Sequence, residues 1–415
     1  MTRWMALLCA AFLGLAALGF PAAGQGTVHL MSGKMTIAVI NDQSGVYADI
    51  GGKNGVEAVR MAVEDFQQKY GAAGAGGPID VLSADHQNKP DVGASKAAEF
   101  YDNGADLVID VPTSSVGIAI AHVAAQKHRV FIAVGAATTA LSNEACNPYT
   151  FHYGYDTYAL ANGMAGAVVE QGGKNWYIIY PNYAYGQDMN AKFSAAVAQA
   201  GGKVLLSDPT PFPNPTEDFS TFLIKARTLR PLLQILGAMQ AGQDLVNLIK
   251  QYNEFGLNKQ GVQLAIGLMF LSDIHSLTPA ALQGSLFTDA WYWNMDKQAR
   301  EWADRFLART KARPTFTQAG DYSGTWQYLE AVRRAGTDDP DKVVAQLEGY
   351  GFSDFFARHG QIRKQDHVLI HDMYLAQVKA PGEVTEPWDY EKIVRTIPAA
   401  QAFQPLSQVH CSMAR

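Results

Sequence analysis

The fold of this chain is decided by the stretch DLVIDVPTSSVGIAIAHVAAQKHRVFIAVGAATTAL, which runs from Asp106 to Leu141. Two short runs rich in β-branched residues, Leu107–Val111 and Val130–Val134, flank an amphipathic segment, Val116–Gln126. Short apolar runs are typical of buried strands, and an amphipathic segment between them is typical of a crossover helix. The stretch therefore predicts a β-α-β unit of a parallel sheet.

Small and hydroxyl-bearing residues follow both predicted strands. Thr113-Ser114-Ser115 comes after the first strand, and Gly135-Ala136-Ala137-Thr138-Thr139 comes after the second. Ligands of such sheets bind at the carboxyl ends of the strands. Because the first turn also begins a helix, its free backbone N–H groups and hydroxyls suit a carboxylate. The alternative is that Ser114 or Ser115 only caps the helix.

The alternation of strands and helices continues on both sides of this unit. Upstream, strands are predicted at 35–40 and 79–83 and helices at 55–68 and 92–101. Downstream, helices are predicted at 158–171, 187–200, 219–226 and 242–255, and strands at 176–180, 203–207, 232–236 and 263–266. We predict an α/β protein with two lobes, each a doubly wound parallel sheet.

Composition limits the size class and the partners. The chain has 415 residues, 48% of them hydrophobic, and a formal net charge of −6. This length predicts more than one domain, because single hydrophobic cores stop growing well below it. Since no run rich in Lys and Arg is present, we expect no nucleic-acid binding and no anionic membrane surface.

The N-terminus has the pattern of a secretory signal peptide. Arg3 precedes an apolar run from Met5 to Phe20, and Ala22-Ala23-Gly24 supplies the small residues of a cleavage site. A membrane anchor, the alternative, needs a longer run of about 20 apolar residues. We predict a signal peptide at 1–24 and a mature protein in the periplasm.

Removal of this peptide would leave two cysteines, Cys146 and Cys411. Disulfides form in oxidising compartments outside the cytoplasm. We therefore predict a Cys146–Cys411 disulfide, with two free thiols as the alternative.

Motifs for catalysis are scarce. The sequence contains no phosphate-binding loop, no HExxH, no G-x-S-x-G and no Cys/His cluster with metal spacing. His275, just past an apolar run, is a weak candidate for a functional histidine. We expect no catalytic residue, no metal and no cofactor. An enzyme on two such sheets remains the alternative, because a fold does not fix a function.

Aromatic residues gather where predicted strands end. Tyr183-Ala184-Tyr185-Gly186 lies in a loop at the end of a strand, which makes it a candidate ligand contact. Trp291-Tyr292-Trp293 is a second cluster, and such clusters more often belong to the core.

Several segments, taken in order, resemble a known family. They are 42–47, 56–62, 112–115, 135–138, 185–187 and 237–242. Their order and spacing resemble the Leu/Ile/Val-binding type of periplasmic solute-binding proteins of ABC transporters, the type I periplasmic binding proteins. The resemblance implies two lobes joined by three crossovers near Tyr155, Leu286 and His371, with a ligand cleft between them. The N-terminal lobe would comprise 35–155 and 287–370, and the C-terminal lobe 156–286 and 371–415.

The resemblance also implies a ligand-binding site. Hydroxyl and backbone N–H groups of the first lobe would hold a carboxylate, at Thr113, Ser114, Ser115, Ala136 and Thr138. Tyr47 would cover the ligand from the same lobe. The second lobe would close with Tyr155, Tyr185, Met239, Gln240, Met269 and Phe270.

One departure from the amino-acid binders bears on the ligand. Where those proteins offer an acidic side chain to the ligand's ammonium, this chain has Leu268-Met269-Phe270. A buried ammonium without a carboxylate costs several kcal/mol, so an α-amino acid would be a poor ligand unless an aspartate substitutes. The candidates for that role are Asp156, Asp244 and Asp273.

Methionine and aromatic side chains suit a flat ring. The stretches after Tyr155 and Phe270 also look like the family branch associated with aromatic carboxylates such as benzoates and phenylpropanoids. The expected function is therefore capture of a small, aromatic carboxylate by hinge closure, and its delivery to an inner-membrane ABC permease by a monomeric protein. A branched-chain amino-acid or amide binder, and a sensor domain feeding a membrane kinase, are the alternatives.

Overall fold

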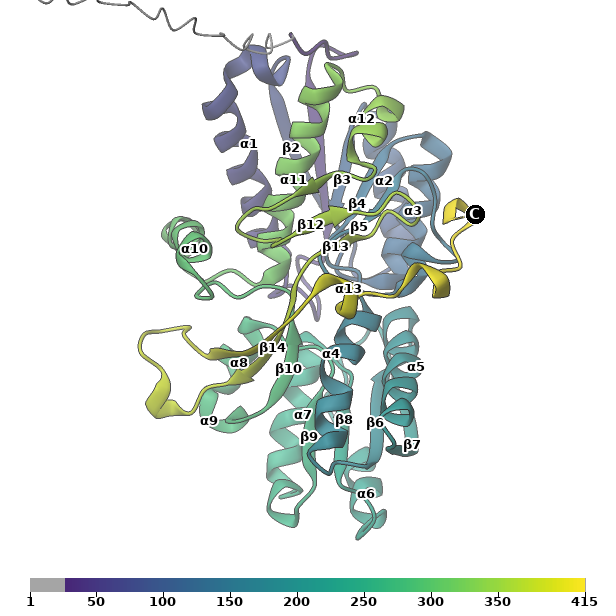
Figure 1. Ribbon diagram of the computed structural model, residues 1–415, viewed down its shortest axis with the longest axis vertical. Coiled ribbons are helices and arrows are strands. Elements are labelled where there is room, and N and C mark those ends of the chain that lie inside the picture. Colours follow the sequence, from purple (N-terminus) through teal and green to yellow (C-terminus); the bar gives the residue numbers. More distant parts are fainter. Residues whose placement is uncertain (1–26, 415) are drawn as a thin grey trace, which may run out of the picture.

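The computed structural model has two lobes arranged one above the other along its long axis (Figure 1). The structure describes residues 27–414, without the side chains of Ala72 and Ala73, so the predicted signal peptide lies outside the described residues. Each lobe contains a parallel sheet with helices on its faces. This arrangement confirms the predicted fold class.

The first lobe is built on a five-stranded sheet of order β2-β1-β3-β4-β5, all parallel. Its strands are β1 (Met35–Asn41), β2 (Ile79–Asp85), β3 (Leu107–Asp110), β4 (Val130–Ala133) and β5 (Thr150–His152). Its main helices are α1 (Gly52–Ala75), α2 (Pro90–Asp102), α3 (Ser114–Lys127) and α11 (Phe316–Ala335). The strand β5 has no counterpart in the sequence analysis, because three residues are too few to show a period.

Alternation along β1 decides which helices cover which face of this sheet. Ile37 and Val39 belong to the core cluster that includes residues of α1 and α11. Ala38 and Ile40 belong to a separate cluster with residues of α2 and α3. Since successive side chains of a strand point to opposite faces, the sheet is covered on both sides.

The second lobe has a four-stranded parallel sheet of order β7-β6-β8-β9. Its strands are β6 (Asn175–Pro181), β7 (Lys203–Thr210), β8 (Ile235–Ala238) and β9 (Gln263–Ile266). Its helices are α4 (Thr157–Glu170), α5 (Ala184–Gln199), α6 (Ser220–Thr228), α7 (Gly242–Glu254), α8 (Leu271–Leu277) and α9 (Pro279–Leu282).

One strand of this lobe differs in position from the prediction. We expected a strand at 232–236, whereas β8 begins at Ile235. The backbone N–H groups of Leu232 and Leu233 both donate to Leu229 O, at 3.1 and 3.2 Å, so these leucines belong to a turn. Leu232 is 64% exposed, which shows that its apolar character does not reflect burial in the sheet.

Beyond residue 285 the chain passes between the lobes. The antiparallel sheet β10-β14-β15 consists of β10 (Leu286–Asp289), β14 (Met373–Val378) and β15 (Glu391–Ile397). The remaining elements are α10 (Lys297–Thr310), α12 (Pro340–Leu347), α13 (Ala399–Ala402) and a small antiparallel sheet of β11 (Gly351–Phe352), β12 (Gly360–Ile362) and β13 (Leu369–Ile370). Short 3-10 helices lie at Thr139–Ser142, Asn258–Gln260, Pro381–Glu383, Leu406–Gln408 and Ser412–Ala414.

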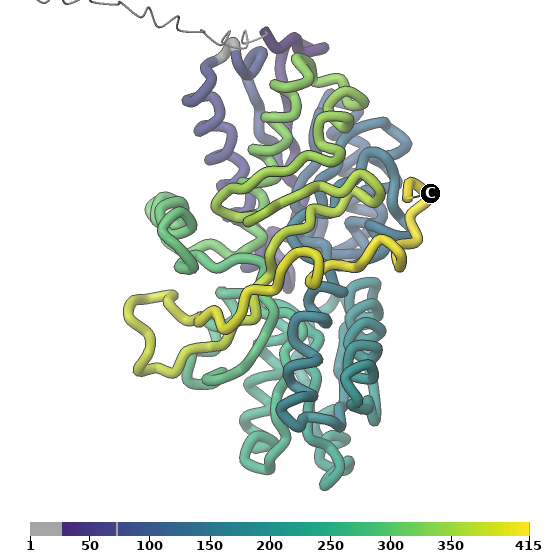
Figure 2. Tube along the Cα trace, in the orientation of Figure 1, coloured from purple at the N-terminus to yellow at the C-terminus, as the bar shows by residue number. Residues whose placement is uncertain are grey.

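The C-terminal segment runs from the second lobe to the side of the first, as the yellow tube of Figure 2 shows. His410 N donates to Asn143 Oδ1 at 2.8 Å, and a disulfide joins Cys146 to Cys411. The predicted disulfide is thereby confirmed. These contacts place the last residues against the first lobe. The residue boundaries predicted for the two lobes remain a proposal.

Among the helices between residues 27 and 414, none is long and apolar enough to cross a membrane.

Candidate ligand-binding site

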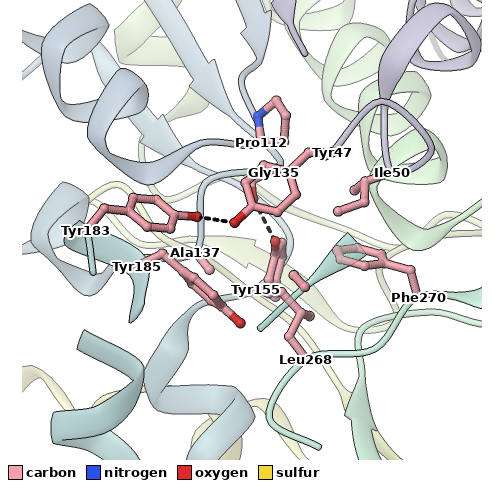
Figure 3. A pocket seen from close by; sticks show the side chains of 11 residues that line it. Tyr47, Ile50, Pro112, Gly135, Ala137, Tyr155, Tyr183, Tyr185, Leu268 and Phe270 are labelled. Atoms are coloured by element: carbon pink, nitrogen blue, oxygen red, sulfur yellow. Dashed lines mark hydrogen bonds between the residues drawn. The ribbon is translucent and has the colours of Figure 1, made fainter. Parts of the chain in front are cut away.

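A pocket lies between the two lobes at the carboxyl ends of both parallel sheets (Figure 3). The narrow space between its lining atoms, including the part open to solvent, amounts to about 240 Å³. Its lining residues are Tyr47, Ile50, Pro112, Gly135, Ala137, Tyr155, Tyr183, Tyr185, Ala241, Leu268 and Phe270. The side chains leave free room for about one water molecule, so the lobes are closed on each other.

Tyrosines of both lobes meet across this pocket. The hydroxyls of Tyr47, from the first lobe, and Tyr183, from the second, are 2.7 Å apart and hydrogen-bonded (Figure 3). The ring of Phe212 stacks on Tyr183 with centroids 3.8 Å apart and lies 5.9 Å from Tyr47. This aromatic group closes one side of the pocket.

A second aromatic group closes the opposite side. Tyr155 donates its hydroxyl to Gly135 O at 2.6 Å, which ties the crossover segment to the turn after β4. The ring of Phe316, at the start of α11, lies 4.8 Å from Tyr155 and 4.7 Å from Phe270. Both lining rings are therefore held by packing, a condition for presenting a preformed surface to a ligand.

Several helices begin at the pocket wall. Pro112 lies just before the N-cap residue of α3, and the lining residues Tyr183, Ala241 and Phe270 are themselves the N-cap residues of α5, α7 and α8. The first N–H groups of a helix have no partner within the helix, and its N-terminus carries a partial positive charge. The pocket is thus favourable for an anion.

The lining side chains themselves carry no charge. Burial raises the pKa of Tyr47, Tyr183 and Tyr185 well above the ordinary value of 10.0, so their hydroxyls stay protonated near neutral pH. No Asp, Glu, Lys or Arg is among the lining residues. Among residues 27–414, no group of three or more His, Cys, Asp and Glu side chains could hold a metal ion.

Two buried polar groups at or beside the pocket have no hydrogen-bond partner among the described residues. They are the hydroxyl of Tyr185, which lines the pocket, and the side-chain amide of Gln240, next to the lining residue Ala241. Gln240 is fully buried, and both its nitrogen and its oxygen lack a partner. Buried polar groups are nearly always paired in native proteins. The hydroxyl of Tyr185, which lines the pocket, is therefore the polar group best placed to meet a ligand.

The structure brings four of the expected site residues to the pocket wall, namely Tyr47, Tyr155, Tyr185 and Phe270. Ala136 lies between the lining residues Gly135 and Ala137. Met239, Gln240 and Met269 are fully buried and do not line the pocket, and neither does Ser115.

The hydroxyls expected to hold the ligand's carboxylate have partners within the protein. Thr113 donates to Asn88 Oδ1. Ser114 Oγ accepts a hydrogen bond of 3.2 Å from Thr138 N, and Thr138 Oγ1 donates to Asp188 Oδ2 at 3.1 Å. In this closed form these side chains do not face an empty site.

The three aspartates considered as partners for an ammonium are all occupied by backbone N–H groups. Asp156 caps α4 by accepting from Ala159 N, and Asp273 accepts from Phe270 N at 2.9 Å. Asp244 accepts from Thr216 N at 2.8 Å. Burial raises the pKa of Asp244 and Asp273 to about 7 and that of Asp156 to about 6.

Sequence analysis missed several lining residues. They are Ile50, Pro112, Gly135, Ala137, Ala241 and Leu268. Each lies within three residues of an expected site residue, so proximity in the sequence was the available signal. Tyr183, which belongs to the candidate ligand-contact loop 183–186, also lines the pocket.

His275 lies outside this pocket. Its ring stacks on Trp388 with centroids 3.6 Å apart, and its Nδ1 is 2.9 Å from the hydroxyl of Tyr390. The histidine therefore packs on the loop between β14 and β15.

Comparison with known proteins gives a consistent result. Residues 34–383 match the family model described as periplasmic binding protein. A crystal structure of a periplasmic binding protein from Burkholderia mallei is 46% identical, with a TM-score of 0.88, over 92% of this chain and all of that one.

Two other solved structures show the range of similarity. A branched-chain amino-acid ABC transporter periplasmic ligand-binding protein from Burkholderia xenovorans is 36% identical, with a TM-score of 0.80, over 92% of this chain and 100% of that chain. A solute-binding protein of an ABC transporter from Rhodopseudomonas palustris, in complex with benzoate, has a TM-score of 0.78 over 92% of this chain and 100% of that chain. At 18% identity it shows a shared fold alone.

Proposed function

We propose that this chain, which belongs to the periplasmic binding protein family, captures a small aromatic carboxylate between its lobes. It then delivers this ligand to an ABC importer. The family implies a small-molecule ligand, a permease partner and a place outside the cytoplasm. The ligand class, the monomeric state and the lack of catalysis are parts of the proposal.

The observation that carries the ligand class is the combination of aromatic walls with helix N-termini. Tyrosine and phenylalanine faces favour offset or edge contacts with a flat ring. The starts of α3, α5 and α7 favour the negative charge of a carboxylate without a basic side chain. One ligand that satisfies both requirements is a benzoate-type anion.

The lining residues also argue against an amine on the ligand. An ammonium buried in this pocket would find no carboxylate among the lining side chains. Leaving such a charge unpaired costs several kcal/mol, which would weaken an α-amino acid strongly. The benzoate complex of the Rhodopseudomonas palustris protein supports the choice of an aromatic acid on this fold.

Binding requires the lobes to open. The closed pocket has no room for a ring, and contacts between the lobes surround it. Besides the pair of tyrosine hydroxyls, Gln243 N at the start of α7 donates to Val46 O at 3.1 Å. We propose that the ligand enters the open form and replaces some of these contacts with its own, so that closure is favoured by its differential affinity.

The direct test is isothermal titration of the ligand-stripped protein. We expect benzoate to bind, and benzyl alcohol, which keeps the ring but not the charge, to bind at least tenfold more weakly, since about 1.4 kcal/mol of anion stabilisation corresponds to that factor. Equal affinities would contradict the role of the helix N-termini.

A matched pair of variants locates the ring. Phe270→Ala removes a wall of the pocket and should abolish most of the benzoate affinity. Phe352→Ala, the same change at a half-buried residue of β11 outside the pocket, should leave it unchanged. Equal loss in both variants would show that the effect is not local.

A branched-chain amino acid or amide is the second candidate. Asp244 favours it, because this buried carboxyl raises the pKa of both Tyr47 and Tyr183 by its charge and therefore lies close to the pocket. If leucine binds and benzoate does not, Asp244→Asn should abolish leucine binding.

A further inference from the structure

The backbone behind the pocket is strained. Asp110 and Val111, at the end of β3, have φ angles of 86° and 63°, in the left-handed region. Two consecutive non-glycine residues rarely adopt such angles, and a β-branched valine least of all. Strain of this kind persists only where neighbouring structure enforces it, and it is concentrated at functional sites. The strained pair leads directly into Pro112, a wall of the pocket, and then into α3.

Asp110 is held in this conformation from two neighbouring strands. Its carbonyl oxygen accepts hydrogen bonds from Val134 N at 3.0 Å and Gly135 N at 3.2 Å. Its Oδ2 accepts from Asn41 Nδ2 at 2.8 Å, and the same amide donates to Gly52 O at 2.7 Å. The position of the pocket wall thus depends on the side chain of Asp110.

A second buried carboxyl faces Asp110. Asp321, in the second turn of α11, is fully buried, and neither of its oxygens has a hydrogen-bond partner among the described residues. A Cβ atom at Gly55 would lie 2.9 Å from Asp110 Oδ2 and 2.9 Å from Asp321 Oδ2, so the two carboxyls approach the same glycine. A Cβ at Gly51 would lie 2.7 Å from Asp110 Oδ2. Gly51 and Gly55, at the start of α1, have no side chains and so leave the space that these carboxyls occupy.

No basic side chain of the described residues pairs with either acid. The groups that face it are the amide of Asn41 from β1, Gly51 and Gly55 from the start of α1, and Tyr155 from the crossover, whose pKa Asp110 raises. No Lys, Arg or His of residues 27–414 contributes to the pKa of either carboxyl. Burial raises the pKa of Asp110 to about 7, and burial together with Asp110 raises that of Asp321 well above its ordinary value.

We propose that Asp110 and Asp321 are positioning residues that keep at least one proton between them and thereby hold the strained turn that presents Pro112 and the N-terminus of α3 to the ligand. Loss of that proton would place two negative charges side by side in a buried site, which drives the carboxyls apart and moves the turn. Ligand affinity should therefore fall as the pH rises. This inference rests on the proposed function for its ligand.

The test is the dissociation constant of benzoate measured from about pH 6 to about pH 9, a range in which benzoate stays ionised and the lining tyrosines stay protonated. In the wild type we expect the constant to rise by up to about tenfold per pH unit above pH 7, the slope for one linked proton. In Asp110→Asn/Asp321→Asn, whose amides imitate the protonated acids, the slope should be clearly smaller, leaving only the contribution of Asp244 near the pocket. A flat wild-type profile, or the same slope in the double variant, would overturn the proposal.

A second buried acid pair provides the control. Asp289 and Glu391 are fully buried and electrostatically linked, but they lie in the β10-β14-β15 sheet and do not line the pocket. Glu391→Gln should change the pH dependence of unfolding and leave the slope of benzoate affinity as in the wild type. A flattened slope in this variant would mean that any buried acid has the effect, which contradicts positioning.

Two further measurements separate the possible failures. If benzoate does not bind at about pH 6, the proposed function fails. The urea midpoint then tests the acid pair alone. As the pH rises, the midpoint should fall in the wild type and fall less in Asp321→Asn. Binding that depends on sodium rather than choline chloride at fixed pH would show that a cation neutralises the pair, and would overturn the shared proton.

Discussion

Hydroxyl groups of single tyrosines connect the two lobes at the pocket. The hydroxyls of Tyr47 and Tyr183 are each other's partners, and both side chains are otherwise surrounded by rings and apolar walls. A buried hydroxyl that loses its only partner costs about 1 to 3 kcal/mol. The closed form therefore depends on this pair more than its single hydrogen bond suggests.

Tyr183→Phe is expected to weaken ligand binding by about tenfold, the factor that corresponds to 1.4 kcal/mol, because Tyr47 keeps an unsatisfied hydroxyl in the closed form. Titration calorimetry measures the change. Tyr149→Phe is the control, since its hydroxyl donates to Asp341 at the surface and Tyr149 does not line the pocket. An unchanged affinity in Tyr183→Phe would remove the tyrosine pair from the closing contacts.

Gln240→Met should separate stability from binding. The change removes a buried amide without partners, so we expect the free energy of unfolding to rise by about 1 to 3 kcal/mol while ligand affinity falls. Gln318→Met is the matched control: that buried amide accepts from Thr315 N and donates to Gly51 O, so its loss should destabilise the protein. Urea unfolding and calorimetry report the two quantities. A less stable Gln240→Met would contradict the unpaired state of the amide.

Whole elements shape the site through their ends. The helices α3, α5 and α7 each begin at the pocket, so the polarity of three helices is focused on one small volume. The C-terminal segment contributes a connection and not a helix end. After β15 it packs α13 on α4, and it then reaches Cys146 in the first lobe. This segment is a covalent connection between lobes in addition to the crossovers.

Removal of the disulfide tests that connection. In Cys146→Ser/Cys411→Ser we expect the free energy of unfolding to fall by about 2 to 5 kcal/mol, because the crosslink closes a long loop of the unfolded chain; the cysteines are 265 residues apart. Urea unfolding is the measurement. Wild type in the presence of a reductant should match the variant, and an unaffected midpoint in both would show that the C-terminal segment adds no stability.

The whole molecule buries many acids, which sets its response to pH. Burial raises the pKa of Asp156 and Asp289 to about 6, and of Asp244 and Asp273 to about 7, from an ordinary value of 3.8. Between these values the native protein holds more protons than the unfolded chain, so the free energy of unfolding falls as the pH rises. His86 and His152, whose pKa burial lowers to about 4, act in the opposite direction only below 6.5.

We therefore expect a lower urea midpoint at about pH 8 than at about pH 6.5. Asp273→Asn, which keeps an oxygen to cap Phe270 N, should show a smaller difference between the two values. A midpoint that rises over this range would mean that the buried acids are ionised in the native state.

Local patterns in the sequence were enough to place most of the elements. The strands β3 (Leu107–Asp110) and β4 (Val130–Ala133) were predictable to within one residue, because apolar β-branched residues pack well in a two-sided sheet and that property is local. The disulfide was predictable as well, since Cys146 and Cys411 are the only pair left once a signal peptide is removed. Beyond residue 285, short antiparallel strands such as β13 (Leu369–Ile370) depend on distant partners and gave no local period.

Composition, periodicity and cysteine number thus determined the α/β class, the two sheets and the crosslink. Only the tertiary structure decided which neighbour in each turn reaches the pocket: Leu268 and Phe270 line it, whereas Met269 between them is buried elsewhere. It also decided that Thr138 meets Asp188, and that two acids far apart in the sequence face the same glycine. The physical reason is that side-chain direction in a turn, and contact between lobes, are set by the packing of distant segments and not by local sequence.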